Sequence, residues 1–339
     1  MTVAVLRPLD DHEHHHAHAH EALEPHGGRY DSILDAIGYT PLVEIPRMSP
    51  NPDVRIFAKL EMLNPTGSVK DRVAKYLIED LEAQGRLRDD SIILEPTSWN
   101  TGIALAMIGR RKGYRVALVM PDNVTNERRQ MASLFGAEVI DSPGSLGSNG
   151  AIALAKHLVS KDERFVMPYQ YGNPANALAH YETTGPEILA DCPEIDVFVA
   201  GLGTSGTLMG VSRYLHERKP GVRIAAAEPL PWELVQGLRS LEEGFVPEIF
   251  EPERIDAKYL VSNRDAIAAL RDLVFKEGIF AGPSCGAVLV AAAREAQTMT
   301  SGTIVALLPD GGWKYLSAGT FSTNLDEMDE ALEGGVNWW

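Results

Sequence analysis

The segment Asn64-Pro65-Thr66-Gly67-Ser68-Val69-Lys70-Asp71-Arg72 joins a Pro/Gly turn to an apolar pattern at helical spacing that runs over 69–84. We expect Lys70 at the mouth of this helix, partly buried beside the positive end of the helix dipole, where the ammonium form is disfavoured. A lysine in that position can act as a neutral nucleophile. Most lysines are solvated surface residues, so this interpretation depends on the turns found elsewhere in the chain.

Short β-rich runs alternate with longer helical runs from residue 30 onward. The predicted strands are 54–61, 92–96, 115–120, 138–141, 165–169, 196–200, 223–228, 258–261 and 303–308. The predicted helices are 69–84, 101–112, 126–135, 148–160, 176–189, 207–218, 264–276 and 286–297. Gly113, Gly136 and Gly278 stand where left-handed helix C-caps would lie, and Ser262 with Asp265 resembles a capping box. The alternation predicts an α/β fold with largely parallel sheets.

Length and composition restrict the class of protein. With 339 residues, 45% of them hydrophobic, the chain is long enough for two domains. No apolar run approaches the roughly eighteen residues of a membrane helix and no secretory pattern opens the chain, so we expect a cytoplasmic protein. The net charge of −16 argues against nucleic acids and anionic membranes as partners. The two cysteines, Cys192 and Cys285, have no zinc or disulfide spacing, and we expect no metal site.

Residues 1–27 stand apart because 11–20 carries six of the ten histidines without hydrophobic periodicity. We interpret this segment as a His-rich disordered extension. Metal chelation by the imidazoles is the alternative, but fixed coordination needs supporting hydrogen bonds that such a tail lacks.

The turn Gly201-Leu202-Gly203-Thr204-Ser205-Gly206 matches G-x-G-x-x-G between a predicted strand and a predicted helix. By pattern it is a dinucleotide fingerprint, and Glu228 ends the next strand, so an NAD-dependent oxidoreductase is one interpretation. The same backbone N–H groups can hold a single phosphate, with Thr204, Ser205 and Thr207 adding hydroxyl donors. The position of the turn in mid-chain and its hydroxyl density favour the single phosphate.

Four segments, 64–72, 95–102, 201–207 and 282–287, together resemble the cysteine synthase branch of the fold-type II pyridoxal phosphate (PLP) enzymes. The resemblance extends to Ile37–Leu42 and Pro309–Ser317. It implies two doubly wound α/β domains with the cofactor in the cleft between them. The implied divisions are a large PLP-binding domain (28–41 and 173–325), a small mobile substrate domain (42–172) and a C-terminal tail (326–339).

The resemblance also implies residue roles. Lys70 would hold PLP and move the Cα proton, Ser284 would bind the pyridine nitrogen, and Asn100 would contact the 3-oxygen. The phosphate would be bound by Gly203, Thr204, Ser205, Gly206 and Thr207, and the substrate by Thr97, Ser98, Trp99, Thr101 and Gln170. A neutral hydroxyl at the ring nitrogen makes the cofactor a weaker electron sink than a carboxylate would, which favours expulsion of a leaving group from Cβ over transamination.

Three positions depart from the resembled pattern. Trp99 replaces a glycine of the substrate loop and would narrow the pocket if its indole points inward. Leu230 follows Glu228-Pro229 where members that use O-phosphoserine have an arginine, so we expect a changed donor specificity unless Arg239 supplies the cation. The tail ends in Trp338-Trp339, an apolar pair that could cover the cleft.

The expected function is β-replacement on O-acetyl- or O-phospho-L-serine through an α-aminoacrylate, with a sulfur nucleophile giving L-cysteine or a cysteine-like amino acid. The alternatives are a β-eliminating lyase of the same fold, the NAD-binding oxidoreductase, and a regulatory protein that keeps the cofactor without synthase activity. The stretches 169–176, 185–190 and 243–247 resemble the type that takes sulfur from a thiocarboxylated carrier protein, which is a candidate partner beside the amino-acid substrate. A homodimer is expected.

Overall fold

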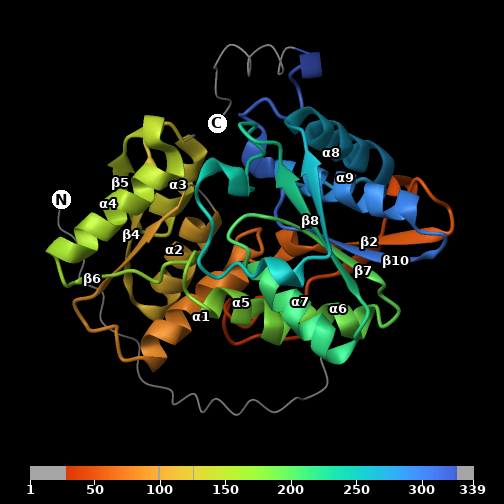
Figure 1. Ribbon diagram of the computed structural model, residues 1–339. Helices are drawn as coiled ribbons and strands as arrows, with labels where there is room; N and C mark the ends of the chain where they lie inside the picture. Colours follow the sequence, from red (N-terminus) through yellow and green to blue (C-terminus); the bar gives the residue numbers. More distant parts are fainter. Residues whose placement is uncertain (1–27, 98–99, 125, 327–339) are drawn as a thin grey trace.

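The computed structural model describes residues 28–326, except 98–99 and 125 (Figure 1). The predictions for the His-rich segment, for Ser98 and Trp99, and for the tail beyond residue 326 lie outside these residues. Within the described ranges, no helix combines the length and the apolar content that crossing a bilayer requires.

The described residues form two separate β-sheets, seen at the right and the left of Figure 1. The larger sheet has the strand order β1-β2-β10-β7-β8-β9, and every pair in it is parallel except β1 with β2. Its strands are β1 (Leu42–Glu44), β2 (Val54–Leu60), β7 (Val197–Gly201), β8 (Arg223–Pro229), β9 (Ala257–Val261) and β10 (Gly302–Leu308).

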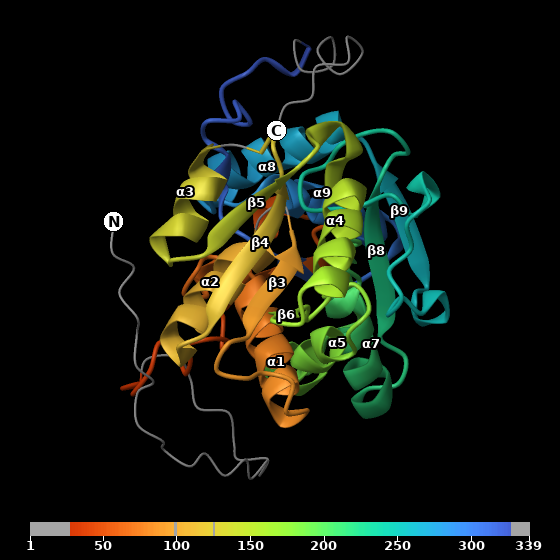
Figure 2. The ribbon, with the colours of Figure 1, turned by 90° about the vertical axis from the view of Figure 1, so that its left-hand side faces the viewer.

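The smaller sheet is wholly parallel, with the order β5-β4-β3-β6 (Figure 2). Its strands are β3 (Ile92–Pro96), β4 (Arg115–Pro121), β5 (Glu138–Ser142) and β6 (Phe165–Val166). The helices that join and cover the strands are α1 (Lys70–Ala83), α2 (Asn100–Lys112), α3 (Asn126–Leu134), α4 (Gly147–Lys161), α5 (Ala175–Ala179), α6 (Gly185–Asp191), α7 (Gly206–Arg218), α8 (Asn263–Glu277) and α9 (Pro283–Thr298).

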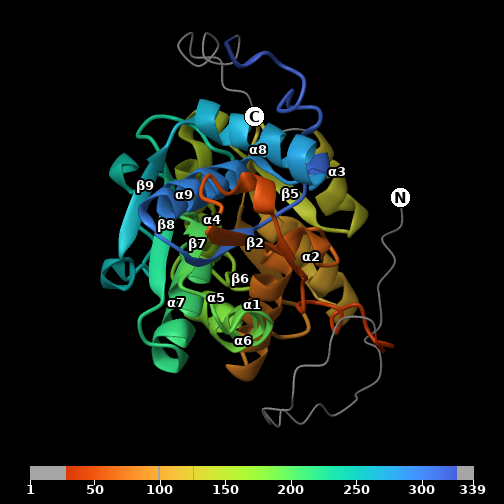
Figure 3. The ribbon, with the colours of Figure 1, turned by 90° about the vertical axis from the view of Figure 1, so that its right-hand side faces the viewer.

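Both sheets are covered by helices on both faces, because alternate residues of a strand point to opposite sides. In β7, Val197 and Val199 pack in the core formed with α8 and α9, whereas Phe198 and Ala200 pack with α6 and α7. Figure 3 shows α8 and α9 above the larger sheet and α5, α6 and α7 below it. The smaller sheet has α1, α2 and α3 on one face and α4 on the other. The prediction of two doubly wound α/β units is confirmed.

The predicted start of the smaller domain at residue 42 differs from the observed sheet. β1 and β2 belong to the larger sheet, where β2 pairs in parallel with β10 from Val54↔Gly302 to Leu60↔Leu308. The smaller hydrophobic core begins with Ala74 and Ile78 of α1. Residues 42–60 are therefore part of the larger unit. The error arose because the parallel partner of β2 lies far along the chain, as the pairing of Val54 with Gly302 shows, and no local pattern indicates it.

The local signals at helix ends are confirmed. Gly113, Gly136 and Gly278 have φ angles of +86°, +85° and +71°, the left-handed conformation expected after a helix. The Ser262 hydroxyl accepts the backbone N–H of Asp265 at 3.0 Å and caps α8. The helix predicted over 176–189 is divided, because residues 180–184 form a π-helical turn between α5 and α6.

Candidate active site

A cavity of about 690 Å³ lies between the two sheets. Its wall is made largely by loops that follow the carboxyl ends of parallel strands, which is where open α/β sheets bind ligands. Eight of the predicted site residues line it: Lys70, Thr97, Asn100, Thr101, Gln170, Gly203, Thr204 and Ser284. Ser205, Gly206 and Thr207 follow directly behind Thr204, at the start of α7. The structure thus brings together residues from widely separated parts of the sequence.

The turn before α1 is fixed by contacts with its surroundings. Gly67 has φ +80°, and a β-carbon there would come within 2.5 Å of the Trp313 ring, so only glycine fits. The Asp71 carboxylate accepts the backbone N–H of Thr66 at 2.7 Å and also its hydroxyl. The Val69 N–H donates to the carbonyl of Pro309 at 2.9 Å, which joins the turn to the end of β10. Lys70, the first residue of α1, is held at the cavity wall as a result.

The environment of Lys70 favours its neutral amine. Burial lowers the pKa of Lys70 from 10.5 to about 8, the nearby Lys314 charge adds to this, and Asp310 and Glu61 oppose it. At pH 7 about a tenth of the amine is therefore unprotonated, a few hundred times more than for an ordinary lysine. This is the condition that both nucleophilic attack and proton abstraction require.

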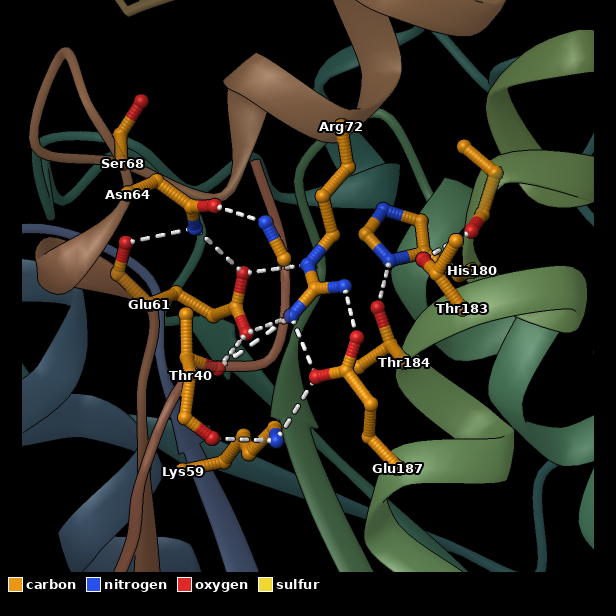
Figure 4. A network of polar contacts seen from close by, with 12 residues as sticks. Thr40, Lys59, Glu61, Asn64, Ser68, Arg72, His180, Thr183, Thr184 and Glu187 are labelled. Atoms are coloured by element: carbon orange, nitrogen blue, oxygen red, sulfur yellow. Dashed lines mark hydrogen bonds and ion pairs between the residues drawn. The ribbon is translucent and has the colours of Figure 1, made fainter. Parts of the chain in front are cut away.

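A buried ion network surrounds Arg72, two residues after Lys70 in the sequence (Figure 4). Arg72 donates from Nε to Glu61 at 2.8 Å and from Nη2 to Glu187 at 2.7 Å, and Lys59 Nζ lies 2.8 Å from Glu187. All four side chains are buried. The network joins α1 to β2 and α6, so it fixes the helix that carries Lys70 against the larger unit.

The start of α7 can hold a phosphate. The side-chain amide of Asn176 donates to Thr204 Oγ1 at 3.0 Å, so this hydroxyl accepts from the protein and keeps its own proton to donate. Ser205 has φ +71°, and its Oγ is buried without a partner among the described residues. The first N–H groups of α7 have no partner within the helix. Backbone N–H groups and hydroxyls thus converge at the start of α7. A compact phosphate group can be bound by such donors alone, without a basic side chain.

The Thr207 hydroxyl contacts a buried histidine. It lies 3.2 Å from Nε2 of His180, whose Nδ1 lies 2.9 Å from the Thr184 hydroxyl. Burial, together with the charges of Arg72 and Lys70, lowers the pKa of His180 well below 6.5, so the ring is neutral. The sequence assigned no role to His180, because the π-helical turn that aims it at α7 has no sequence signal of its own.

Ser284 is not the helix cap that an isolated serine at a turn would suggest. The N-cap of α9 is Gly282, which has no side chain, and Ser284 lies within the first turn. A β-carbon built on Gly237 would lie 3.3 Å from Ser284 Oγ, so the hydroxyl lies close to the backbone at Gly237. Both residues line the cavity. The contact of Ser284 with a ring nitrogen stays a prediction.

Thr101 and Glu95, on either side of the turn after β3, bind the segment after β6. Thr101 donates its hydroxyl proton to Gln170 Oε1 at 2.6 Å, and the carboxylate of the buried Glu95 accepts the backbone N–H groups of Tyr169 and Gln170 at 2.8 and 3.0 Å. Burial raises the pKa of Glu95 to about 8, and the two N–H donors oppose this. Glu95 was not predicted as a site residue, since it resembles an ordinary strand position until its long-range partners are known.

Two further groups lie at the site: one around Asp310, to which the sequence assigned no role, and Arg239, which the sequence offered as the alternative cation to position 230. Asp310 Oδ2 accepts from Asn100 at 2.8 Å and from the Tyr315 hydroxyl at 2.6 Å, and Lys314 Nζ donates to Asn100 Oδ1 at 2.7 Å. Arg239 lines the cavity with its guanidinium 4.6 Å from the centre of the Phe245 ring, whereas Leu230 is not part of the wall. The stretch 309–317 resembled the family, but nothing in it indicated a contact with Asn100.

Comparisons with known proteins identify the family of this chain. The family model described as "Pyridoxal-phosphate dependent enzyme" matches residues 33–310. Cysteine synthase B of Escherichia coli strain K12 is 41% identical over 291 residues, covering 86% of this chain and 96% of that protein.

Two solved structures are similar over most of their length. A cysteine synthase from Entamoeba histolytica has a TM-score of 0.83 and 35% identity, covering 92% of this chain and 98% of its own. An O-ureido-L-serine synthase has a TM-score of 0.82 and 38% identity, covering 89% of this chain and all of its own.

The family match also decides the interpretation of the glycine-rich turn, because it supports pyridoxal phosphate and not NAD as the cofactor. The donor set fits this group: a lysine with a lowered pKa, hydroxyl and backbone donors at a helix start, and a serine facing the cavity from α9. The chain belongs to the pyridoxal-phosphate-dependent enzyme family.

Proposed function

We propose that the protein catalyses β-replacement on an activated L-serine, with a sulfur nucleophile that gives L-cysteine or a closely related amino acid. The observation that carries this proposal is the convergence of Lys70, the start of α7 and Ser284 on one cavity. The relatives named above make cysteine or another substituted serine by their names, which supports the same class of product here.

Each part of the site has a role in this proposal. When bound, pyridoxal phosphate supplies the carbonyl that condenses with the substrate amine and the ring that delocalises charge from Cα. The start of α7 binds the phosphate, Ser284 the ring nitrogen and Asn100 the 3-oxygen. The Lys70 amine removes the Cα proton, the β-substituent leaves with its bonding electrons, the thiolate adds to Cβ, and Lys70 returns the proton to Cα.

The substrate carboxylate is proposed to lie against the loop that holds Thr97 and Thr101. Gln170 supports this loop, because its Oε1 accepts from Thr101 and its Nε2 lies 3.4 Å from the Pro96 carbonyl. Ser98 and Trp99 complete the loop in the sequence. The smaller unit is proposed to move toward the larger one when the carboxylate binds.

We propose Arg239 as the group that recognises an anionic leaving group. Lys70 and Arg239 are the basic side chains among the described residues of the cavity wall. The Arg239 guanidinium is placed by the rings of Phe245 and Tyr171, at 4.6 and 5.3 Å from their centres. Stacking leaves its N–H groups available for hydrogen bonds in the plane of the guanidinium, a geometry that suits a phosphate. An O-phospho-L-serine donor is therefore supported beside O-acetyl-L-serine.

We also propose a sulfur source, an oligomeric state and a cellular location. The resemblance of 169–176, 185–190 and 243–247 supports a thiocarboxylated carrier protein as the sulfur source and a homodimeric assembly. The charge of −16 supports a cytoplasmic location away from anionic surfaces. Light scattering of the purified protein tests the dimer, and an assay with thiocarboxylated carrier against free sulfide tests the source.

The test of the function is an absorption spectrum followed by a product assay. The wild type should show a visible band, which should change on addition of a serine ester, and adding sulfide should yield cysteine. Lys70→Ala should lower turnover by about 10²–10⁴-fold, as expected for loss of a general base. Lys75→Ala, a lysine of the same helix outside the cavity wall, is the matched control.

Three outcomes would contradict the proposal. Pyruvate and ammonia formed at the same rate with and without thiol would identify an eliminating lyase. A spectral change without any product would identify a protein that binds the substrate without replacing its β-substituent. An unchanged spectrum with every serine ester would exclude this substrate class.

A further inference from the structure

The side-chain amide of Asn100 lies between two buried groups of opposite charge. Its Nδ2 donates to Asp310 Oδ2 at 2.8 Å, and its Oδ1 accepts from Lys314 Nζ at 2.7 Å. Both partners come from the segment after β10, more than 200 residues away in the sequence. Asp310 and Lys314 are 1% and 5% exposed, so neither charge is screened by bulk water.

These partners determine which way the amide points. A carboxylate can only accept hydrogen bonds and an ammonium can only donate them. Turning the amide over would place an NH₂ group against the ammonium and an oxygen against the carboxylate, losing both bonds. The Asn100 oxygen is therefore committed to Lys314 and one N–H to Asp310. What remains of the amide is the second N–H, a donor, and one lone pair on an oxygen that the Lys314 ammonium already polarises.

Asp310 also aligns the other parts of the site. Its backbone forms an antiparallel bridge with Ser68, two residues before Lys70, and its carbonyl accepts the N–H of Gly282 at 3.0 Å, two residues before Ser284. Tyr315 donates to the same carboxylate oxygen as Asn100, at 2.6 Å. The other oxygen, Oδ1, is buried without a hydrogen-bond partner among the described residues. Asp310 thus contacts the turn before Lys70, the turn before Ser284 and the Asn100 amide.

Lys314 binds the oxygen of the Asn100 amide, whereas Asp310 binds its nitrogen. Its Nζ donates to the Gly67 carbonyl at 3.0 Å as well as to Asn100. The ammonium therefore links the turn before Lys70 to the first residue of α2. A change at Lys314 reaches Asn100 through this hydrogen bond and Lys70 through its charge, so only a cycle that includes Asn100→Ala separates the two effects.

We propose that Asp310 and Lys314 are positioning residues that fix the Asn100 amide as a hydrogen-bond donor toward the cofactor's 3-oxygen, so that the site selects the ionised form of that oxygen. This inference rests on the proposed role of Asn100. It assigns a function to a carboxylate and an ammonium that the β-replacement chemistry itself does not use. A fixed N–H forms a stronger hydrogen bond to an ionised oxygen than to a neutral hydroxyl, so it favours the ionised form.

The test is a pair of double-mutant cycles that measure the affinity of the cofactor-free protein for PLP and the position of its visible band. The variants are Lys314→Met, Asp310→Ala, Asn100→Ala and the two doubles with Asn100→Ala. Each single variant should weaken PLP binding by about tenfold or more, the value of one hydrogen bond to a charged group. Once Asn100 has been replaced, either second change should weaken binding by less than about threefold, because its effect acts through Asn100.

Tyr315→Phe is the matched comparison, since it removes the other bond to Asp310 Oδ2 and leaves the bond to Asn100 in place. It should shift the visible band less than Lys314→Met does. Thermal unfolding of every variant verifies folding, and if Asp310→Ala does not fold, the Lys314 cycle carries the same test.

Equal losses of affinity in the wild-type and Asn100→Ala backgrounds would overturn the inference, because they would show a purely structural role. An unchanged affinity and band in Asn100→Ala would overturn it as well. Neither measurement depends on turnover, so failure of the β-replacement proposal would be seen separately.

Discussion

Asn176 occupies the space where residue 206 would carry a side chain: a β-carbon built on Gly206 would lie 1.9 Å from Asn176 Oδ1. The same amide donates to the Gln170 carbonyl at 2.7 Å and to Thr204 at 3.0 Å, so it cannot withdraw without losing both bonds. Gly206→Ala should therefore displace the start of α7 and destabilise the protein by about 1–3 kcal/mol, as overpacking does. Chemical denaturation measures this, and an unchanged midpoint with normal PLP retention would show that the turn can adapt.

The Thr204 hydroxyl should bind the phosphate through the proton that Asn176 leaves free. Thr204→Val, which keeps the shape, should weaken PLP binding by roughly 1.5–3 kcal/mol for a lost hydrogen bond to a charged group. Thr204→Ser keeps the hydroxyl and is the control, expected within about threefold of the wild type. Thr207→Val should have a smaller effect, because that hydroxyl lies against His180. Equal PLP dissociation constants for Thr204→Val and Thr204→Ser would exclude the contact.

Lys70 should reduce the stability of the cofactor-free protein. Its pKa falls from 10.5 to about 8 on burial, so between these values the unfolded chain binds more protons and stability rises with pH. Below pH 8 the full penalty is present. Lys70→Met should therefore stabilise the cofactor-free protein at pH 7 by about 1–3 kcal/mol and abolish the rise at higher pH. Lys75→Met on the same helix is the control, and a destabilised Lys70→Met protein would contradict the lowered pKa.

Arg239 should discriminate between donors by the charge of the leaving group. Arg239→Leu should lower kcat/KM for O-phospho-L-serine by about 10–100-fold and that for O-acetyl-L-serine by less than about threefold, since only the phosphate gains charged hydrogen bonds. Leu230→Arg is the comparison suggested by the sequence, and because Leu230 lies outside the cavity wall its effect should be small. A large gain for O-phospho-L-serine in Leu230→Arg would assign the contact to position 230 instead.

Arg72 and Arg55 make salt bridges of similar length in opposite environments. Arg72→Leu should destabilise the protein by about 3–5 kcal/mol, because it leaves the buried Glu61 without its ionic partner and Glu187 with Lys59 alone. Arg55→Leu should change stability by less than about 1 kcal/mol, since its 2.9 Å bridge to Glu44 is half exposed. Urea unfolding of both variants makes the comparison. Similar losses would mean that the buried network is repacked at little cost.

The same ion network should make the stability of the protein depend on pH in the acid range. Burial raises and the Arg72 charge lowers the pKa of Glu187, with a net fall from 4.5 to about 2. Its contribution to stability is therefore complete above pH 4.5 and is lost as the pH falls toward 2. In Arg72→Leu this acid-dependent loss should be reduced, which unfolding measured across that range would reveal.

The fold could be predicted from local patterns because most of its elements have a local sequence signal. The run 223–228 is β-rich and observed as Arg223–Pro229, and Ser262 caps α8 as its position suggested. β1 was missed because three residues at an antiparallel edge carry no periodicity. The π-helical turn at 180–184 was missed because its residues carry no signal that distinguishes it from an α-helix.

The site was predicted where a turn motif carries it and missed where it depends on distant contacts. Lys70, Thr204 and Ser284 stand at strand-to-helix or turn-to-helix junctions that the sequence displays. Asp310 and Lys314 gain their meaning only from Asn100, which is 210 and 214 residues away. No spacing rule operates over that separation, so these residues became visible only in the folded chain.

The position of β2 between β1 and β10 constrains the order in which the protein can form during synthesis. The strands of the smaller sheet are all present once residue 166 has been made, so that sheet can assemble early from neighbouring segments. β2 is made before it, yet its parallel partner is 302–308. The larger sheet, and with it the wall formed by Pro309 and Asp310, must wait for nearly the whole chain. The cofactor site is therefore the last part of the molecule to close, which leaves the β2 edge exposed throughout translation.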